Sequence, residues 1–275
     1  MTPYLKALIP PLFALSYNKI RGKGVQWSGN YSSWEQALKN CNGYEDAEIF
    51  QKVKKAAIAV KEGEAIYERD SVLFYQPAYS WELIANLLKM ALEEDGELCV
   101  LDFGGAFGST YFQNRSYLSG INNLTWCIVE QAHFVDFGKK HFENDTLRFY
   151  YSLDEVLVEH KPRVLLLLSV LQYLPNPWEW IQKFKESGIP DILIDRTAFI
   201  GGNSKDKLTI QKIPKNIYRA SYPAWFFNED KFVATFEPEF ELVAANESNI
   251  TKSIFLGAKE AYWKNFVFRK NNEST

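Results

Sequence analysis

The fold of this chain is decided by the stretch LDFGGAFGS, residues 101–109. It overlaps the end of ELCVLDF (97–103), an apolar run with the length of a buried strand, and it leads into a helical pattern at about 108–118. Glycines let a backbone turn tightly and approach a ligand closely. Free N–H groups at the start of a helix favour negative or electron-rich groups. The stretch therefore predicts a ligand-binding turn between a strand and a helix.

The same strand-and-helix alternation continues toward the C-terminus. Apolar runs of strand length recur as LTWCIVE (124–130), LRFYY (147–151), RVLLLLS (163–169) and DILIDR (191–196). Helical patterns follow at about 132–143, 153–160 and 177–187. Such an alternation indicates a parallel sheet that helices cover on both faces. We therefore predict an α/β fold with a doubly wound, mostly parallel sheet of the Rossmann-like type.

The segments around this alternation complete the predicted architecture. Residues 1–79 are expected to form a helical N-terminal or cap section, in which Ser32 and Glu35 have the spacing of a capping box and residues 67–76 are irregular. Residues 80–275 are expected to form the α/β domain, with an insertion at about 197–227. The runs at 240–247 and 261–270 predict a final strand pair that is partly antiparallel.

Composition narrows the classes of function. The chain has 275 residues, of which 47% are apolar, and a formal net charge of −3. A sequence-independent nucleic-acid binder usually has a basic surface, so nucleic acid is disfavoured as a partner. The three cysteines have no framework spacing, which predicts a reducing compartment, and no His/Cys cluster has zinc-ligand spacing, so no metal is expected.

The N-terminal arm allows two interpretations. Its apolar stretch is interrupted by Pro10 and Pro11 and is too short for a membrane-spanning helix. It lacks a small-residue cleavage site of the secretory form. Lys19, Arg21 and Lys23 suit a weak contact with an anionic membrane surface. The alternative is an arm packed on the domain.

Two classes of cofactor use a glycine-rich turn of this kind. The dinucleotide pattern G-x-G-x-x-G, started at Gly104, requires glycines where the chain has Ala106 and Ser109, which disfavours a nicotinamide oxidoreductase. The pattern Asp-x-Gly-x-Gly-x-Gly is matched at Asp102, Gly104 and Gly108, with Ala106 replacing the middle glycine. This match resembles the first motif of S-adenosylmethionine-dependent methyltransferases. The alternative is a tight turn without a ligand.

The end of the second strand supports the cofactor interpretation. Glu130 closes LTWCIVE, and a carboxylate at this strand end can accept hydrogen bonds from both ribose hydroxyls of an adenosyl ligand. The alternative is a surface glutamate that is favourable at a helix start. The segment after the fourth strand, VLQYLPNP (170–177), is similar to the stretch that faces the methyl group in methyltransferases.

Several motifs together resemble one family. WSGNYSSWEQAL, YERDSVLF, LDFGGAFGS, VEQ, LLSVLQYLPNP, IDRTAF and SYPAWFF occur in this order over about residues 25–240. This order resembles the methyltransferases associated with bacterial surface-polysaccharide gene clusters. The resemblance implies a methyltransferase with S-adenosylmethionine as cofactor and a sugar-linked or small-molecule acceptor. The reducing compartment indicated by the cysteines predicts a cytoplasmic location. The cofactor contacts that the resemblance implies are Asp102, Gly104, Gly105, Ala106, Phe107, Gly108, Glu130, Gln131, Ser169 and Leu171.

Candidate catalytic residues follow from the chemistry of methyl transfer. An oxygen acceptor needs a base within hydrogen-bond reach. Asp195 at the end of the fifth strand suits that role, and Arg196 suits a phosphate or carboxylate of the acceptor. Tyr173 lies in the segment that resembles the one facing the methyl group in methyltransferases. The alternative for Asp195 and Arg196 is a buried structural ion pair.

Candidate acceptor residues come from two other parts of the chain. Arg69 and Asp70 are expected to cover the acceptor pocket, with a packing salt bridge as the alternative. Tyr75, Tyr222 and Trp225, with Tyr173, suit a wall for sugar stacking, with core packing as the alternative. The second function that the sequence allows is a binding protein with the methyltransferase fold and no turnover.

Overall fold

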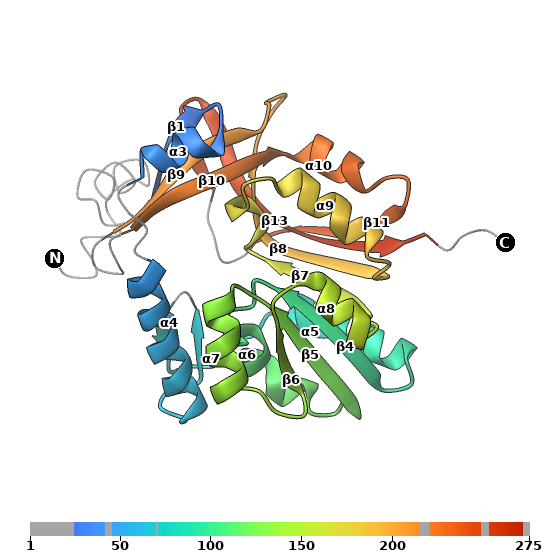
Figure 1. Cartoon of the computed structure of the whole chain (residues 1–275). Helices are drawn as coiled ribbons and strands as arrows, with labels where there is room; N and C mark the ends of the chain where they lie inside the picture. The colour runs from blue at the N-terminus through green and yellow to red at the C-terminus, as the bar shows by residue number, and fades with distance from the viewer. Residues whose placement is uncertain (1–24, 42–45, 70, 215–219, 249–252, 272–275) are drawn as a thin grey trace, which may run out of the picture.

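The computed structural model describes residues 25–41, 46–69, 71–214, 220–248 and 253–271 (Figure 1). The strands are β1 Gln26–Tyr31, β2 Tyr67–Arg69, β3 Val72–Phe74, β4 Glu97–Phe103, β5 Asn123–Val129, β6 Leu147–Tyr150, β7 Val164–Leu168, β8 Asp191–Ile200, β9 Lys207–Ile213, β10 Ala220–Asn228, β11 Phe240–Glu247, β12 Ile254–Leu256 and β13 Lys259–Lys270. The helices are α3 Trp34–Lys39, α4 Asp46–Lys61, α5 Trp81–Glu93, α6 Ser109–Leu118, α7 Ala132–His141, α8 Leu153–Glu159, the short 3₁₀ helix η1 Leu171–Tyr173, α9 Pro177–Glu186 and α10 Glu229–Phe236.

A parallel sheet forms the centre of the molecule. Its strands lie in the order β6-β5-β4-β7-β8, and every neighbouring pair is parallel. The apolar side chains of α5, α6 and α7 pack on one face of this sheet, and those of α8, α9 and α10 pack on the other. The predicted doubly wound α/β fold is therefore confirmed. The strand order reverses between β4 and β7, which is where ligands bind in sheets of this type.

Antiparallel strands extend the sheet beyond β8. β13 pairs with β8 along most of its length, and β11 and β12 pair with β13, all antiparallel. The predicted antiparallel final pair is thus confirmed. β10 touches β8 only at Phe227 and Asn228, and then diverges to pair with β9, which pairs in turn with β1 (Figure 1).

Strand β10 lies almost entirely within the insertion predicted at about residues 197–227. Pro223 lies inside this strand, and a proline argues against an ordinary central strand because it has no N–H to donate. Here Pro223 pairs with Ile210 of β9, while the pairing of β10 with β8 begins four residues farther on, at Phe227. The missing N–H of Pro223 therefore interrupts no strand pairing among the residues that the structure describes.

The N-terminal section contains strands as well as helices. Residues 67–76, predicted to be irregular, contain the antiparallel hairpin β2–β3. Strand β1 belongs to the main sheet through β9, although the division of the chain at residue 79 stays a prediction. The N-cap of α3 is Ser33, which accepts from the Gln36 N–H, so the capping interaction lies one residue later than the predicted pair of Ser32 and Glu35.

The predicted interpretations of the N-terminal arm fall on residues 1–24, outside the described residues. Among the helices that the structure describes, none has the length and apolar character needed to cross a membrane.

Candidate active site

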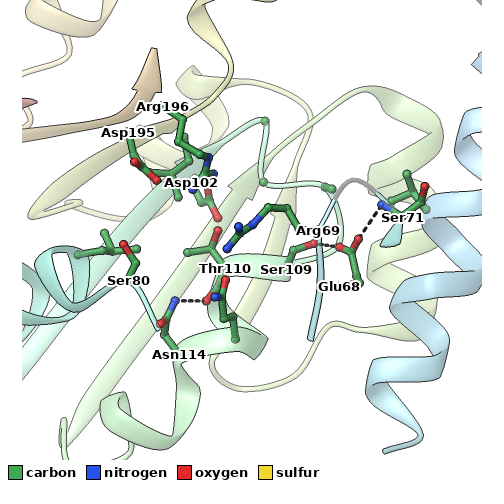
Figure 2. Close-up of a pocket in the computed structure, with 17 residues that line it drawn as sticks. Glu68, Arg69, Ser71, Ser80, Asp102, Ser109, Thr110, Asn114, Asp195 and Arg196 are labelled. Atoms are coloured by element: carbon green, nitrogen blue, oxygen red, sulfur yellow. Dashed lines mark hydrogen bonds and ion pairs between the residues drawn. The ribbon is translucent and has the colours of Figure 1, made fainter. Parts of the chain in front are cut away.

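A pocket opens at the carboxyl end of β4, beside the reversal of strand order (Figure 2). Three elements supply most of its wall: the turn between β4 and α6, the first residues of α6, and the hairpin β2–β3. The lining residues are Val53, Glu68, Arg69, Ser71, Ser80, Leu83, Asp102, Gly104, Gly105, Ala106, Ser109, Thr110, Gln113, Asn114, Leu168, Asp195 and Arg196. The structure thus brings the predicted turn together with Arg69, Asp195 and Arg196, which lie far apart in the sequence.

Glycine is required at two neighbouring positions of the turn. Gly104 has a φ of +76°, and a Cβ atom there would lie 2.8 Å from Cγ2 of Val170. A Cβ atom on Gly105 would lie 2.6 Å from Cγ of Asp102. Any side chain at these positions would collide with the end of β4 or with the segment after β7. The glycines therefore allow the chain to close tightly around the floor of the pocket.

Strained backbone is concentrated around this pocket. Ala106, Ser169 and Arg196 have φ values of +49°, +62° and +52°, a region that residues with a side chain rarely adopt. Ala106 and Ser169 follow β4 and β7 at their carboxyl ends, whereas Arg196 lies within β8, which continues to Ile200 beyond the strand end predicted at residue 196. Such strain costs on the order of 1–3 kcal/mol per residue and is most common at functional sites. The distribution of backbone strain therefore indicates a functional site at this edge of the sheet.

Asp102 forms a buried floor under the turn. Its side chain accepts a hydrogen bond of 3.1 Å from Nε1 of Trp126, and the residue is 1% exposed. Burial, assisted by the negative charge of Glu130, raises the pKa of Asp102 to about 7, while Trp126 and Arg196 act in the opposite direction. The carboxyl group is thus poised to respond to a positive charge that enters the pocket.

Glu130 supports the turn from the neighbouring strand. Its carboxylate accepts hydrogen bonds from the backbone N–H groups of Gln131, at 2.8 Å, and of Ala106. Burial raises the pKa of Glu130 in spite of these two donors. The residue lies beside the pocket without lining it. Its predicted contact with a ribose stays a prediction.

The other predicted cofactor residues divide into two groups. Phe107 and Leu171 have fully buried side chains that belong to the hydrophobic core, so neither presents its side chain to the pocket. Gly108, Gln131 and Ser169 belong to the turns around the pocket but do not line it. Gly108 is the N-cap of α6, and the Ser169 N–H donates to the Asp195 carbonyl at 2.8 Å.

Asp195 and Arg196 form an ion pair with each other at the edge of the pocket, through Oδ2 and Nη1. The backbone of Arg196 is fixed on both sides, because its N–H donates to Oδ1 of Asn265 and its carbonyl accepts from Nε2 of Gln172. The ion pair expected under the structural interpretation is therefore present, and both residues also line the pocket, as the functional interpretation requires. Arg69 projects from β2 into the same pocket (Figure 2), while Asp70 lies outside the described residues.

Glu68 is a pocket residue that the sequence analysis did not select. It is 4% exposed, and its carboxylate accepts hydrogen bonds from the Ser109 hydroxyl and from the Ser71 N–H, the latter at 3.0 Å. The N-cap of α6 is Gly108, which has no side chain to cap the helix. Glu68 therefore provides negative charge at the start of α6 and ties the hairpin to the turn. The sequence feature that could have identified Glu68 as a pocket residue is its position directly before Arg69.

The predicted aromatic wall is only partly assembled. The rings of Tyr173 and Tyr222 meet edge to face at 5.3 Å, and both hydroxyls bond to the side-chain amide of Gln211. The indole of Trp225 donates to the Leu174 carbonyl at 3.2 Å and packs against the core, and Tyr75 is 64% exposed after β3. None of these four aromatic residues lines the pocket at the turn.

A second pocket adjoins the first one and shares Asp195 with it. It lies between α5 and the strands β8, β11 and β13, and Leu168 also belongs to both pockets. Its polar lining residues beyond the shared ones are Glu82, Asn86, Asn246 and Asn265. Asp195 thus stands where two adjacent cavities meet.

Comparisons with known proteins find similarity in solved structures only. No family model matches the chain, and no curated protein matches its sequence. The N-terminal domain of EvdMO1, solved in the presence of S-adenosylhomocysteine and D-fucose, is 12% identical with a TM-score of 0.48, over 84% of this chain and 100% of that one.

Two further solved structures are similar at the same level. A S-adenosylmethionine-dependent methyltransferase from Clostridium acetobutylicum is 9% identical with a TM-score of 0.46, over 80% of this chain and 98% of that one. CalS10, an amino pentose methyltransferase from Micromonospora echinaspora, is 11% identical with a TM-score of 0.43, over 70% of this chain and 93% of that one. These likenesses are too distant to transfer a ligand or an activity to this chain.

Proposed function

We propose that this protein is an S-adenosylmethionine-dependent methyltransferase whose cofactor binds in the pocket at the β4–α6 turn. One observation carries the proposal: Arg69 and Arg196 project into a pocket floored by the buried Asp102 (Figure 2). Two guanidinium groups and one carboxyl group match the charges of an amino acid, with its carboxylate and its ammonium group. S-adenosylmethionine carries such an amino-acid end, and the glycine turn beside Asp102 leaves room for the rest of the ligand.

The remaining part of the cofactor is proposed to follow the turn toward β5. Glu130 already lies against the turn through the Ala106 N–H, so its carboxylate is within reach of a ribose placed there. Its two hydrogen-bonding oxygens suit the two ribose hydroxyls. In this arrangement Asp102 and Glu130, at the ends of neighbouring strands, bind opposite ends of one adenosyl ligand.

The proposed reaction is an in-line displacement. The sulfonium group of the cofactor supplies an activated methyl group, and the protein aligns it with the acceptor. Oδ2 of Asp195 is held by Arg196, and Oδ1 is proposed to take the proton of the acceptor hydroxyl as the new C–O bond forms and the C–S bond breaks. S-adenosylhomocysteine and the methylated acceptor are then released.

The acceptor is proposed to occupy the second pocket, because Asp195 belongs to both cavities. Asn86, Asn246 and Asn265 offer amide donors and acceptors of the kind that bind sugar hydroxyls. A sugar-linked acceptor in surface-polysaccharide biosynthesis is therefore the proposed substrate class, and the three free thiols suit a reducing, cytoplasmic location. Tyr173 and Tyr222 are proposed to border the path of a longer acceptor.

Replacing Arg69 by glutamine is expected to weaken S-adenosylhomocysteine binding by about 10- to 100-fold, because a hydrogen bond to a charged group contributes about 1.5–3 kcal/mol. Isothermal titration calorimetry measures the affinity. Arg115→Gln is the matched control, since Arg115 is exposed on α6 outside the pocket. Equal affinities of the two variants would remove Arg69 from the cofactor site.

Replacing Asp195 by asparagine is expected to lower turnover by about 100-fold or more, the usual contribution of a general base. The affinity for S-adenosylhomocysteine should change by less than about threefold, because the amide oxygen can still accept from Arg196. Transfer of a labelled methyl group to nucleotide-sugars and glycans measures turnover, and Asp145→Asn, at an exposed position, is the control. Full activity of Asp195→Asn would assign the base to another residue.

The same transfer assay separates the proposal from a binding protein with this fold. Such a protein would bind S-adenosylmethionine without consuming it in the presence of any acceptor. Calorimetry with NAD distinguishes both from a nicotinamide oxidoreductase, because such an enzyme would bind NAD more tightly than S-adenosylmethionine.

A further inference from the structure

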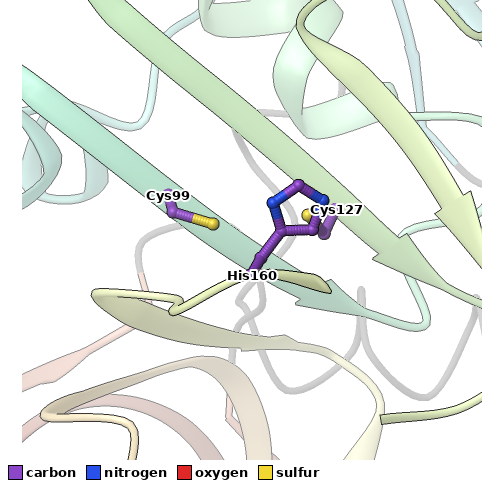
Figure 3. A group of neighbouring side chains, drawn as sticks. All are labelled: Cys99, Cys127 and His160. Atoms are coloured by element: carbon purple, nitrogen blue, oxygen red, sulfur yellow. The ribbon is translucent and has the colours of Figure 1, made fainter. Parts of the chain in front are cut away.

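Two cysteines and a histidine converge at a distance from the proposed cofactor site. Cys99 lies near the start of β4, Cys127 lies on β5, and His160 follows α8 (Figure 3). One ligand atom from each, the two sulfurs and an imidazole nitrogen, lie within 4.8 Å of one another. Their separation in the sequence matches no metal-binding spacing, because the three residues come from three different elements.

The parallel register explains why the two thiols meet. Cys99 pairs with Thr125 and Leu101 pairs with Cys127, so the two cysteines are diagonal neighbours on adjacent strands. Side chains two residues apart along a strand point to the same face. Both thiols therefore lie on the face that α8 and α9 cover, and Cys127 is fully buried there.

A hydrogen-bond chain fixes the tautomer of His160. The Tyr150 hydroxyl is 2.9 Å from Oε2 of Glu159 and 2.7 Å from Nε2 of His160. A carboxylate has no proton to donate, so the Tyr150 hydroxyl donates its single proton to Glu159. The hydroxyl oxygen must then accept from the Nε2–H of His160. Nδ1 is left with a lone pair.

The surroundings favour a bound metal ion. In metal sites, a histidine ligand usually donates its other ring N–H to a second group that orients it, and here Tyr150 fills that role. Cys99 and His160 also line a cavity that gives an ion and a water molecule a route to the cluster.

We propose that Cys99, Cys127 and His160 form a Zn²⁺ site, with both thiolates and Nδ1 of His160 as ligands and water from the adjoining cavity as the fourth. In a tetrahedral site, Zn–S and Zn–N bonds of about 2.3 Å and 2.0–2.1 Å separate the ligand atoms by about 3.6–3.8 Å. Separations of up to 4.8 Å would therefore have to shorten by about 1.2 Å at most. Binding releases the two thiol protons. The bound ion links β4 and β5 to the connection between α8 and β7.

The proposal is tested on the full chain, reduced and freed of metal with a chelator. Titration with Co²⁺, followed by its thiolate-to-metal charge-transfer absorption, is expected to saturate at one equivalent, and Zn²⁺ should displace the Co²⁺ and raise Tm. Cys99→Ser and His160→Gln should abolish the absorption. Cys41→Ser should retain it fully, because Cys41 lies beside α3, outside the cluster.

Tyr150→Phe tests the orienting role separately. Loss of a group that orients a metal ligand by a hydrogen bond typically weakens metal affinity by about 10- to 100-fold. A purely structural tyrosine would change only the stability of the metal-free protein. The proposal is overturned if the wild-type chain binds no Co²⁺ or Zn²⁺, or if Cys99→Ser and His160→Gln bind it as the wild type does. It is also overturned if mild oxidation joins Cys99 to Cys127 equally fast with and without Zn²⁺. These results are independent of S-adenosylhomocysteine binding.

Discussion

Replacing Gly104 by valine should abolish detectable S-adenosylhomocysteine binding, with a loss of at least about 100-fold, or about 2.7 kcal/mol. A Cβ atom at this position would lie 2.8 Å from Val170, and the φ of +76° is unfavourable for a β-branched residue. The turn must therefore move away from Val170. That movement displaces the backbone that the proposed ligand contacts. Calorimetry on the folded variant measures the loss.

The control for this experiment is Gly63→Val. Gly63 has a φ of +82°, close to that of Gly104, but a Cβ atom there would meet no heavy atom within 4 Å. This variant carries the same kind of backbone strain, about 1–2 kcal/mol, without a collision and outside the pocket. It should lose stability and keep its affinity. If both variants bind S-adenosylhomocysteine as the wild type does, the turn is not the binding site.

Replacing Asp102 by asparagine should remove a large pH dependence of stability. The pKa of Asp102 is raised by burial from 3.8 to about 7 in the folded protein. The folded state therefore binds more protons than the unfolded state between these values, and the free energy of unfolding falls as pH rises through this window. Between pH 5 and pH 8 this group should reduce the stability of the wild type by roughly 2–3 kcal/mol.

Urea denaturation at the two pH values checks this expectation. An asparagine at residue 102 stays neutral and can still accept the hydrogen bond from Trp126, so Asp102→Asn should lack that part of the decline. The relevant quantity is the difference between the wild type and the variant, because the other titrating groups are common to both. Parallel pH profiles would mean that Asp102 is not a buried acid with a raised pKa.

The parallel core was predictable from the sequence because each of its strands is buried on both faces. β4 has the predicted bounds, and β5 to β7 differ from theirs by one residue at most at either end. The segments that escaped prediction depend on contacts distant in the sequence. Strand β1 forms only because β9 lies beside it, and β10 contains a proline that its unpaired edge tolerates. The local pattern of residues in the sequence does not indicate pairing between strands that lie far apart along the chain.

The candidate site was predictable in its backbone and less so in its side chains. The glycine turn, Asp102, Arg69 and Asp195–Arg196 line one pocket, although β8 continues past Arg196 to Ile200 and does not end there as predicted. Phe107 and Leu171 belong instead to the core, because residues on a turn can point either way and sequence spacing does not resolve the direction. Glu68 reaches Ser109 through the fold of a hairpin that local propensity did not predict.

The most direct test of the proposed function is the crystal structure of the protein soaked in S-adenosylhomocysteine. We predict electron density for the amino-acid end of the ligand between Arg69, Arg196 and Asp102, with its ribose beside Glu130. Density for the ligand elsewhere, or an empty pocket at saturating ligand in crystals whose pocket is open to solvent, would contradict the account.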